Sequence, residues 1–159
     1  MRTRIVVGTL LVALALGVHG QPGGVDDHRL LGAGTDRANW LNHGRDYGNQ
    51  RFSPLTQIDA DNVASLRPAW IYQSGVPSTF QATPIVADGV MYVSLPFNHV
   101  VALDARTGRE LWRYTHKRRT DKMCCGPANR GVAVAYGKVY MGTVDARLVA
   151  LDAGTGKLV

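Results

Sequence analysis

The sequence is poor in cysteine, in charge and in long apolar runs, and these shortages exclude several classes of protein. Charged residues make up only 19% of the 159 residues, whereas glycine occurs 18 times. This balance favours short strands joined by tight turns over a helical bundle. The apolar run at residues 5–18 is shorter than the roughly 20 residues that span a bilayer. No Cys-x-x-Cys-His motif is present, so this sequence contains no covalent haem site. His43 and His99 have no companion ligands at metal spacing and are predicted to be structural.

The first twenty residues are predicted to be a secretory signal peptide. Met1–Arg4 is positively charged, residues 5–18 are apolar, and Val18 and Gly20 fit the small-residue pattern of a cleavage site. An uncleaved anchor is the alternative. Export would place the protein in the periplasm, an oxidising compartment in which disulfides persist. Residues 21–36 are polar and glycine-rich without periodicity, and we expect a flexible leader there.

The only two cysteines, Cys124 and Cys125, are adjacent and begin the segment Cys-Cys-Gly-Pro-Ala-Asn-Arg-Gly. Neighbouring Cα atoms lie about 3.8 Å apart, whereas ordinary disulfides join Cα atoms roughly 4.4–6.8 Å apart. A bond between these two residues would be strained and would constrain almost no chain entropy. It would therefore serve as a rigid plate or a redox pair. Two free thiols, or pairing elsewhere, are the alternatives.

The second half of the chain repeats itself with a spacing of 48 residues. Residues 86–111 align with residues 134–159 without a gap, and 11 of the 26 positions are identical. Gly89 aligns with Gly137, and Asp104 aligns with Asp152. A repeat near this length indicates a propeller, a solenoid or an array.

Each repeat has the pattern of short strands separated by turns. Asp88-Gly89 lies between two apolar runs, which is typical of a two-residue hairpin with positive φ at both positions. Gly108 is expected in the left-handed conformation of a second turn. We expect strands at residues 82–86, 90–94, 99–103 and 110–114. Four antiparallel strands in a repeat of this size form one blade of a β-propeller, so the fold class is all-β.

One motif of the repeat is specific enough to indicate a family. Residues 102–112, Ala-Leu-Asp-Ala-Arg-Thr-Gly-Arg-Glu-Leu-Trp, resemble the tryptophan-docking motif A-x-D-x-x-T-G-x-x-x-W of quinoprotein dehydrogenases. Residues 150–159 carry the same motif without its final tryptophan. In that family the tryptophan stacks between neighbouring blades, and the alanine makes room for it.

Further stretches extend this resemblance over residues 40–159. Residues 40–55 and 62–70 are similar to the opening of alcohol dehydrogenases that use pyrroloquinoline quinone (PQQ), and residues 124–131 resemble the vicinal-disulfide segment that lies against PQQ. The chain thus resembles the PQQ-dependent (quinoprotein) alcohol dehydrogenase family, whose propeller has eight blades.

The resemblance implies a cofactor site. Cys124 and Cys125 would form a disulfide ring stacked on PQQ, and Arg130 would donate to the quinone oxygens. A structural cation paired with an aspartate is the alternative for Arg130. Ala128 stands where the family places a small apolar contact. Gln81 stands where a cofactor-contacting glutamate is expected, and it can still donate or accept a hydrogen bond.

The resemblance also implies that much of the propeller lies outside this sequence. Residues 37–159 provide about two blades, so we expect the N-terminal part of a longer protein. The ligands of the family's metal, Ca²⁺ or a lanthanide ion, would lie beyond Val159. Its catalytic base would lie there as well. No catalytic or metal-binding residue is therefore assigned here, and the 159 residues alone are expected to be inactive.

The function implied is that of an exported PQQ-dependent dehydrogenase oxidising a primary alcohol or a similar small hydroxylated substrate. A c-type cytochrome is the implied electron acceptor. The alternative is a propeller without cofactor that acts as a scaffold, as in outer-membrane assembly. The basic residues 116–119 and Lys122 are expected to form a solvated loop, with docking of an acidic acceptor as the alternative. Neither nucleic-acid binding nor stable membrane insertion is expected.

Overall fold

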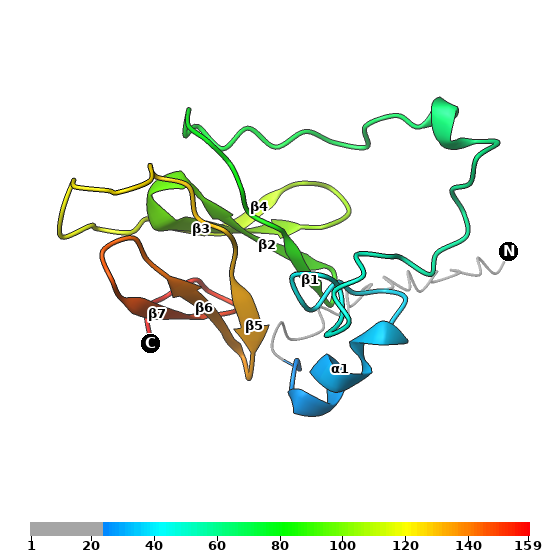
Figure 1. The fold of residues 1–159 in the computed structure, drawn as a ribbon, viewed down its shortest axis with the longest axis horizontal. Coiled ribbons are helices and arrows are strands. Elements are labelled where there is room, and N and C mark those ends of the chain that lie inside the picture. Colours follow the sequence, from blue (N-terminus) through cyan, green and yellow to red (C-terminus); the bar gives the residue numbers. More distant parts are fainter. Residues whose placement is uncertain (1–23) are drawn as a thin grey trace, which may run out of the picture.

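The computed structural model describes residues 24–159 (Figure 1). The predicted signal peptide, residues 1–20, lies outside this range. Among the described residues, no helix has both the length and the apolar character needed to cross a membrane. The helices are short: α1 at Asp27–Leu31 and three 3₁₀ turns at Gly32–Gly34, Val63–Ser65 and Pro96–Asn98. The strands are β1 Ile85–Ala87, β2 Val90–Leu95, β3 His99–Asp104, β4 Glu110–Tyr114, β5 Ala133–Ala135, β6 Lys138–Gly142 and β7 Leu148–Asp152.

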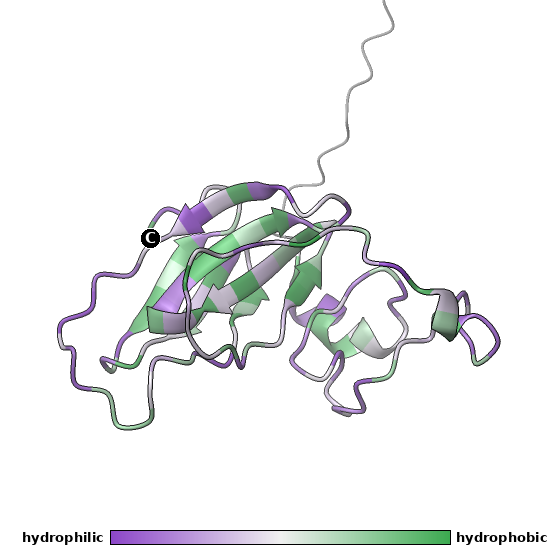
Figure 2. Cartoon of the chain, turned by 90° about the horizontal axis from the view of Figure 1, so that it is seen from above, coloured by the Kyte–Doolittle hydropathy of each residue, from purple (hydrophilic) through white to green (hydrophobic). Residues whose placement is uncertain are grey.

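The strands form two antiparallel sheets, which confirms the predicted all-β blade structure. The first sheet has the order β1-β2-β3-β4, and the second has the order β5-β6-β7. Figure 2 shows that hydrophobic residues are concentrated in the strands and hydrophilic residues in the loops. The first sheet is a complete four-stranded blade, as the repeat predicted.

The 48-residue repeat is also a repeat of strand register. Ile85 pairs with Tyr92 in the first sheet, and the equivalent Ala133 pairs with Tyr140 in the second. The predicted hairpin is confirmed by the positive φ of Asp88 (51°) and Gly89 (79°). The second repeat has the same backbone at its corresponding turn. Similar local sequences therefore fold into two similar sheets.

The two sheets are joined by the tryptophan of the repeat motif. The Trp112 indole N–H donates to the Ala153 carbonyl at 2.9 Å, and a Cβ added to Gly156 would collide with the indole ring. The ring also lies 5.9 Å from Tyr92, whose hydroxyl donates to the same carbonyl at 3.3 Å. Trp112 thus packs on the following repeat, as the resemblance implied.

A second tryptophan docks in the same way on the first sheet. The Trp70 indole N–H donates to the Ala105 carbonyl at 3.3 Å, and its ring covers Gly108. Trp70 is the anchor of a long segment without strands, which Figure 1 shows leaving the sheets near residue 50 and returning before β1. This docking role was not predicted for Trp70.

The segment expected to be a flexible leader differs from that expectation in its described part. Residues 24–36 contain α1 and a 3₁₀ turn, with Asp26 as the N-cap of α1. The side chain of Val25 is buried in the core. The Arg29 guanidinium donates two hydrogen bonds of 2.9 Å to the Asp88 carboxylate at the hairpin of the first sheet. The Val25 carbonyl in turn accepts from the Tyr136 N–H of the second sheet at 2.8 Å. Tertiary contacts with both sheets, which leave no local periodicity, hold this segment in place.

Candidate functional site

The predicted site residues come together beside the loop that joins β4 to β5. A hollow of about 180 Å³ is lined by all five residues assigned from the sequence, together with three neighbours. The five are Gln81, Cys124, Cys125, Ala128 and Arg130. The neighbours are Met123, Gly126 and Val144. Gln81 comes from the segment before β1 and Val144 from the turn between β6 and β7, so the hollow forms only when both sheets are assembled.

The predicted disulfide between Cys124 and Cys125 is wrong for this structure. Both cysteines are free and exposed, and their Sγ atoms lie 2.8 Å apart, beyond the roughly 2.05 Å of a disulfide bond. The close Cα spacing of neighbouring residues makes the ring a strained alternative to two thiols. The hydrogen bond with Cys124 raises the pKa of the Cys125 thiol, while the nearby charge of Arg130 acts in the opposite direction.

Arg130 is exposed at the edge of this hollow. Among residues 24–159, its guanidinium has neither a carboxylate within ion-pair distance nor a side-chain hydrogen bond. The structural alternative, an arginine paired with an aspartate, therefore has no contact to support it in the described part of the chain. A cation of this kind can donate to an anionic ligand.

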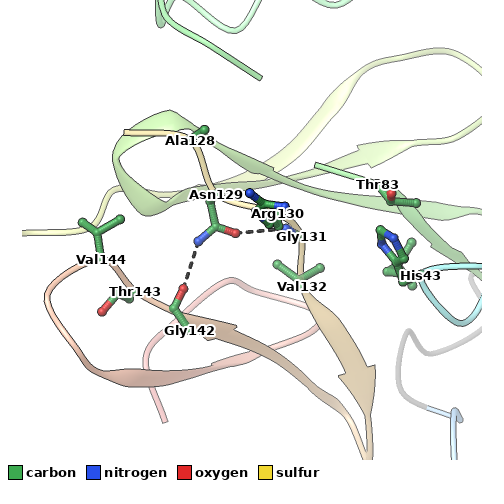
Figure 3. Close-up of a pocket in the computed structure, with 11 residues that line it drawn as sticks. His43, Thr83, Ala128, Asn129, Arg130, Gly131, Val132, Gly142, Thr143 and Val144 are labelled. Carbon is green, nitrogen blue, oxygen red and sulfur yellow. Dashed lines mark hydrogen bonds between the residues drawn. The ribbon is translucent and has the colours of Figure 1, made fainter. Parts of the chain in front are cut away.

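Asn129 positions the backbone on either side of Arg130. Its Nδ2 donates to the Gly142 carbonyl at 2.9 Å, and its Oδ1 accepts from the Gly131 N–H at 3.0 Å (Figure 3). The same Nδ2 also donates to Asn98 Oδ1 at 3.0 Å. The residue is nearly buried, at 9% exposure. Asn129 belongs to the cysteine segment, but no role was predicted for it from the sequence. The one feature of the sequence that could have indicated this role is the amide side chain itself, because a buried amide needs several hydrogen-bond partners.

A backbone bridge fixes the end of the same loop. Thr83 and Gly131 form an isolated parallel bridge, and Gly131 has φ of 133°. A Cβ at Gly131 would lie 3.3 Å from the Thr83 carbonyl oxygen. The Phe97 N–H donates to the Pro127 carbonyl at 2.8 Å. Together with the bond from Asn129 to Gly142 of β6, these contacts hold the cysteine-bearing loop on both sheets.

Beside the hollow is a larger cavity of about 420 Å³, whose lining residues Figure 3 shows. The two share Ala128, Arg130 and Val144. The larger cavity is also lined by His43, whose Nε2 lies 2.8 Å from an Arg51 nitrogen. Arg130 therefore lies where the two spaces meet and can act on a ligand in either.

No metal centre is present in the part of the chain that the structure describes. Residues 24–159 contain no group of three or more histidine, cysteine, aspartate or glutamate side chains arranged to hold an ion. The hollow instead offers one amide, two thiols and a guanidinium that has no carboxylate partner among residues 24–159.

Two antiparallel blades joined by a docked tryptophan define a β-propeller of the tryptophan-docking class. Residues 40–159 match the family model PQQ, described as the glucose/ethanol/alcohol dehydrogenase β-propeller domain. Because this match covers well over half of the sequence, the chain belongs to that family of PQQ-type propellers.

The relatives are alcohol dehydrogenases. The chain is 43% identical to quinohemoprotein alcohol dehydrogenase ADH IIB of Pseudomonas putida, over 100% of this chain and 24% of that protein. It is 49% identical to 1-butanol dehydrogenase (cytochrome c) of Thauera butanivorans, over 76% of this chain and 18% of that protein. The solved structure of ADHIIG from Pseudomonas putida HK5 matches 87% of this chain and 21% of its own, with a TM-score of 0.83 and 48% identity. The chain thus spans less than a quarter of the length of these relatives.

Proposed function

We propose that this chain supplies the quinone-contacting part of a PQQ-dependent dehydrogenase that oxidises a primary alcohol or a similar small hydroxylated substrate. The observation that carries the proposal is the hollow in which all five residues assigned to the cofactor converge. The names of the relatives support the alcohol as substrate class.

The residues present fit the chemistry of PQQ, a flat molecule with quinone oxygens and carboxylates. Arg130 has a guanidinium without a carboxylate partner among the described residues, and Gln81 adds an uncharged amide. Gly126 has open space where a Cβ would lie, and Ala128 adds only a methyl group. The lining therefore combines flat, small surfaces with donors for anionic oxygens.

Each residue then has a defined part in the proposed site. Arg130 would donate to ligand oxygens and stabilise the negative charge on them. Gln81 would hydrogen-bond a carboxylate or ring group, and Ala128 would make an apolar contact. The thiols of Cys124 and Cys125 would lie against the ring. When bound, PQQ supplies the acceptor for the electrons removed from the alcohol. A Ca²⁺ or lanthanide ion and the catalytic base would be held by residues outside 24–159.

The wider setting of the reaction also belongs to this proposal. The predicted signal peptide supports action in the periplasm. The cytochrome c in the name of the 1-butanol dehydrogenase supports a c-type cytochrome as acceptor. Membership of a dehydrogenase family favours this function over the scaffold alternative.

Binding of PQQ to the protein expressed from its complete gene tests the proposal. Arg130→Ala should weaken binding about tenfold or more, because hydrogen bonds to charged groups contribute roughly 1.5–3 kcal/mol. Arg109→Ala is the matched control, since Arg109 is also exposed but lies in the turn before β4. Quenching of tryptophan fluorescence during titration with PQQ and Ca²⁺ provides the dissociation constants. Equal affinity of Arg130→Ala and the unmodified protein, or no binding to either, would overturn the proposal.

A further inference from the structure

Two buried side chains from different sheets meet at the base of the cysteine-bearing loop. His116 lies two residues after β4, and Asp145 lies in the turn between β6 and β7. His116 Nε2 and Asp145 Oδ1 are 2.9 Å apart, and the two side chains are only 1% and 2% exposed. The pair is 29 residues apart in sequence and is not part of the cofactor site described above.

His116 is held from the first sheet as well. Its Nδ1 lies 3.2 Å from the Tyr114 hydroxyl, and its backbone N–H donates to His99 Nδ1 at 3.0 Å. Both ring nitrogens of His116 therefore have partners, which fixes the orientation of the imidazole. These bonds fix His116 at the point where the chain passes from β4 into the loop.

Asp145 uses both of its carboxylate oxygens. Oδ1 faces His116, and Oδ2 accepts from the backbone N–H of Arg119 at 3.1 Å. Arg147 Nε lies 3.9 Å from Oδ2. The hydrogen bond from the Thr143 side chain, followed by that from His116, holds the pKa of Asp145 well below its ordinary value. The carboxylate is thus ionised and bonded to both the second sheet and the loop.

The turn that carries Asp145 also forms a wall of the cofactor hollow. Val144, its immediate neighbour, lines the hollow together with residues of the loop. Figure 1 shows the loop between β4 and β5 projecting beyond the first sheet on the side where the β6–β7 turn lies. The contacts of Asp145 with His116 and Arg119 therefore join the loop to this turn.

We propose that His116 and Asp145 form a clip that positions the loop bearing Cys124 and Cys125 against the β6–β7 turn, and so sets the shape of the cofactor hollow. Neither residue lines the hollow, so both are positioning residues. The part of the proposal that concerns PQQ rests on the proposed function above. The positioning of the two thiols does not depend on it.

The test uses the protein expressed from its complete gene, with Asp145→Asn and His116→Gln as variants. Asparagine removes the charge and cannot accept from both His116 and the Arg119 N–H, whereas glutamine at 116 keeps an amide donor toward Asp145. Asp121→Asn is the control for charge in the same loop, because Asp121 is 95% exposed and pairs with Arg118. Asp152→Asn is the control for stability, because Asp152 caps a turn of the second sheet through Thr155.

Two measurements are made in addition to the melting temperature. The first is the rate at which iodoacetamide alkylates each cysteine of the reduced, PQQ-free protein, resolved by mass spectrometry. The second is the dissociation constant for PQQ. In Asp145→Asn we expect the ratio of the two alkylation rates to change about threefold or more and PQQ binding to weaken about tenfold. His116→Gln should show smaller changes in the same direction, and Asp121→Asn should match the unmodified protein.

The outcomes separate the two proposals. If Asp145→Asn only lowers the melting temperature, as Asp152→Asn does, with unchanged alkylation and PQQ binding, the clip is wrong. If the alkylation ratio shifts while even the unmodified protein binds no PQQ, the clip stands and the proposed function fails. Should Asp145→Asn fail to fold, unchanged alkylation and PQQ affinity in His116→Gln and in a His116→Ala variant would equally overturn the clip.

Discussion

The indole of Trp112 rests on Gly156, and its N–H donates to the carbonyl of Ala153 at 2.9 Å. This one side chain connects the complete first blade to the turn that ends the second sheet. The contact needs a residue without a Cβ, because any side chain at position 156 would enter the space of the ring. Gly156 also has φ of 70°, a conformation that glycine adopts without strain.

Gly156→Ala is therefore expected to destabilise the fold by about 2 kcal/mol or more, from overpacking and from backbone strain. Urea unfolding followed by tryptophan fluorescence measures this change. Gly154→Ala is the matched control two residues earlier, where an added Cβ would meet only Asp152 Oδ1 at 3.6 Å. If the two variants unfold at the same urea concentration, the close packing of Trp112 on Gly156 does not contribute to stability.

The turn aspartate of the repeat should make stability depend on pH. Hydrogen bonds from the Thr107 side chain and N–H hold the pKa of Asp104 below its ordinary value of 3.8. Its contribution is therefore fully present above the unfolded pKa and is lost as the pH falls through the lower folded pKa. The unfolding midpoints of the unmodified protein and of Asp104→Asn should differ at pH 7, and the difference should shrink as the pH falls below 3.8. A difference that stays constant over this range would contradict the prediction.

Asn129 is expected to couple stability to the cofactor site. Asn129→Ala removes three hydrogen bonds and leaves the Asn98 side chain without that buried partner. The free energy of unfolding should fall by about 2–3 kcal/mol, and PQQ should bind more weakly because the backbone around Arg130 is released. Asn39→Ala serves as the control, since Asn39 makes comparable side-chain hydrogen bonds with Asp36 and the Asp88 N–H, and does not line the hollow. Calorimetric melting and PQQ titration of both variants distinguish a local effect at the hollow from general destabilisation.

Some features were not predictable because they depend on contacts between distant residues. Trp70 is 35 residues before its acceptor Ala105, whereas Trp112 is 41 residues before its acceptor Ala153. Because these separations differ, Trp70 does not align with Trp112 in the 48-residue repeat. The ion pair of Arg29 with Asp88 spans 59 residues, and the pair of His116 with Asp145 spans 29. None of these pairs leaves a periodic or motif-like pattern.

The sequence by itself determined the blade. The alternation of apolar residues, the Asp88-Gly89 turn and the glycine at 108 specify strands and hairpins locally, because they depend on backbone conformation and on which face is buried. The family motifs placed five residues at one site. Only the tertiary structure decided that Cys124 and Cys125 are two thiols, that residues 24–36 contact both sheets, and that His116 meets Asp145. These outcomes depend on distances between side chains of different sheets, and such distances exist only after the two sheets have packed.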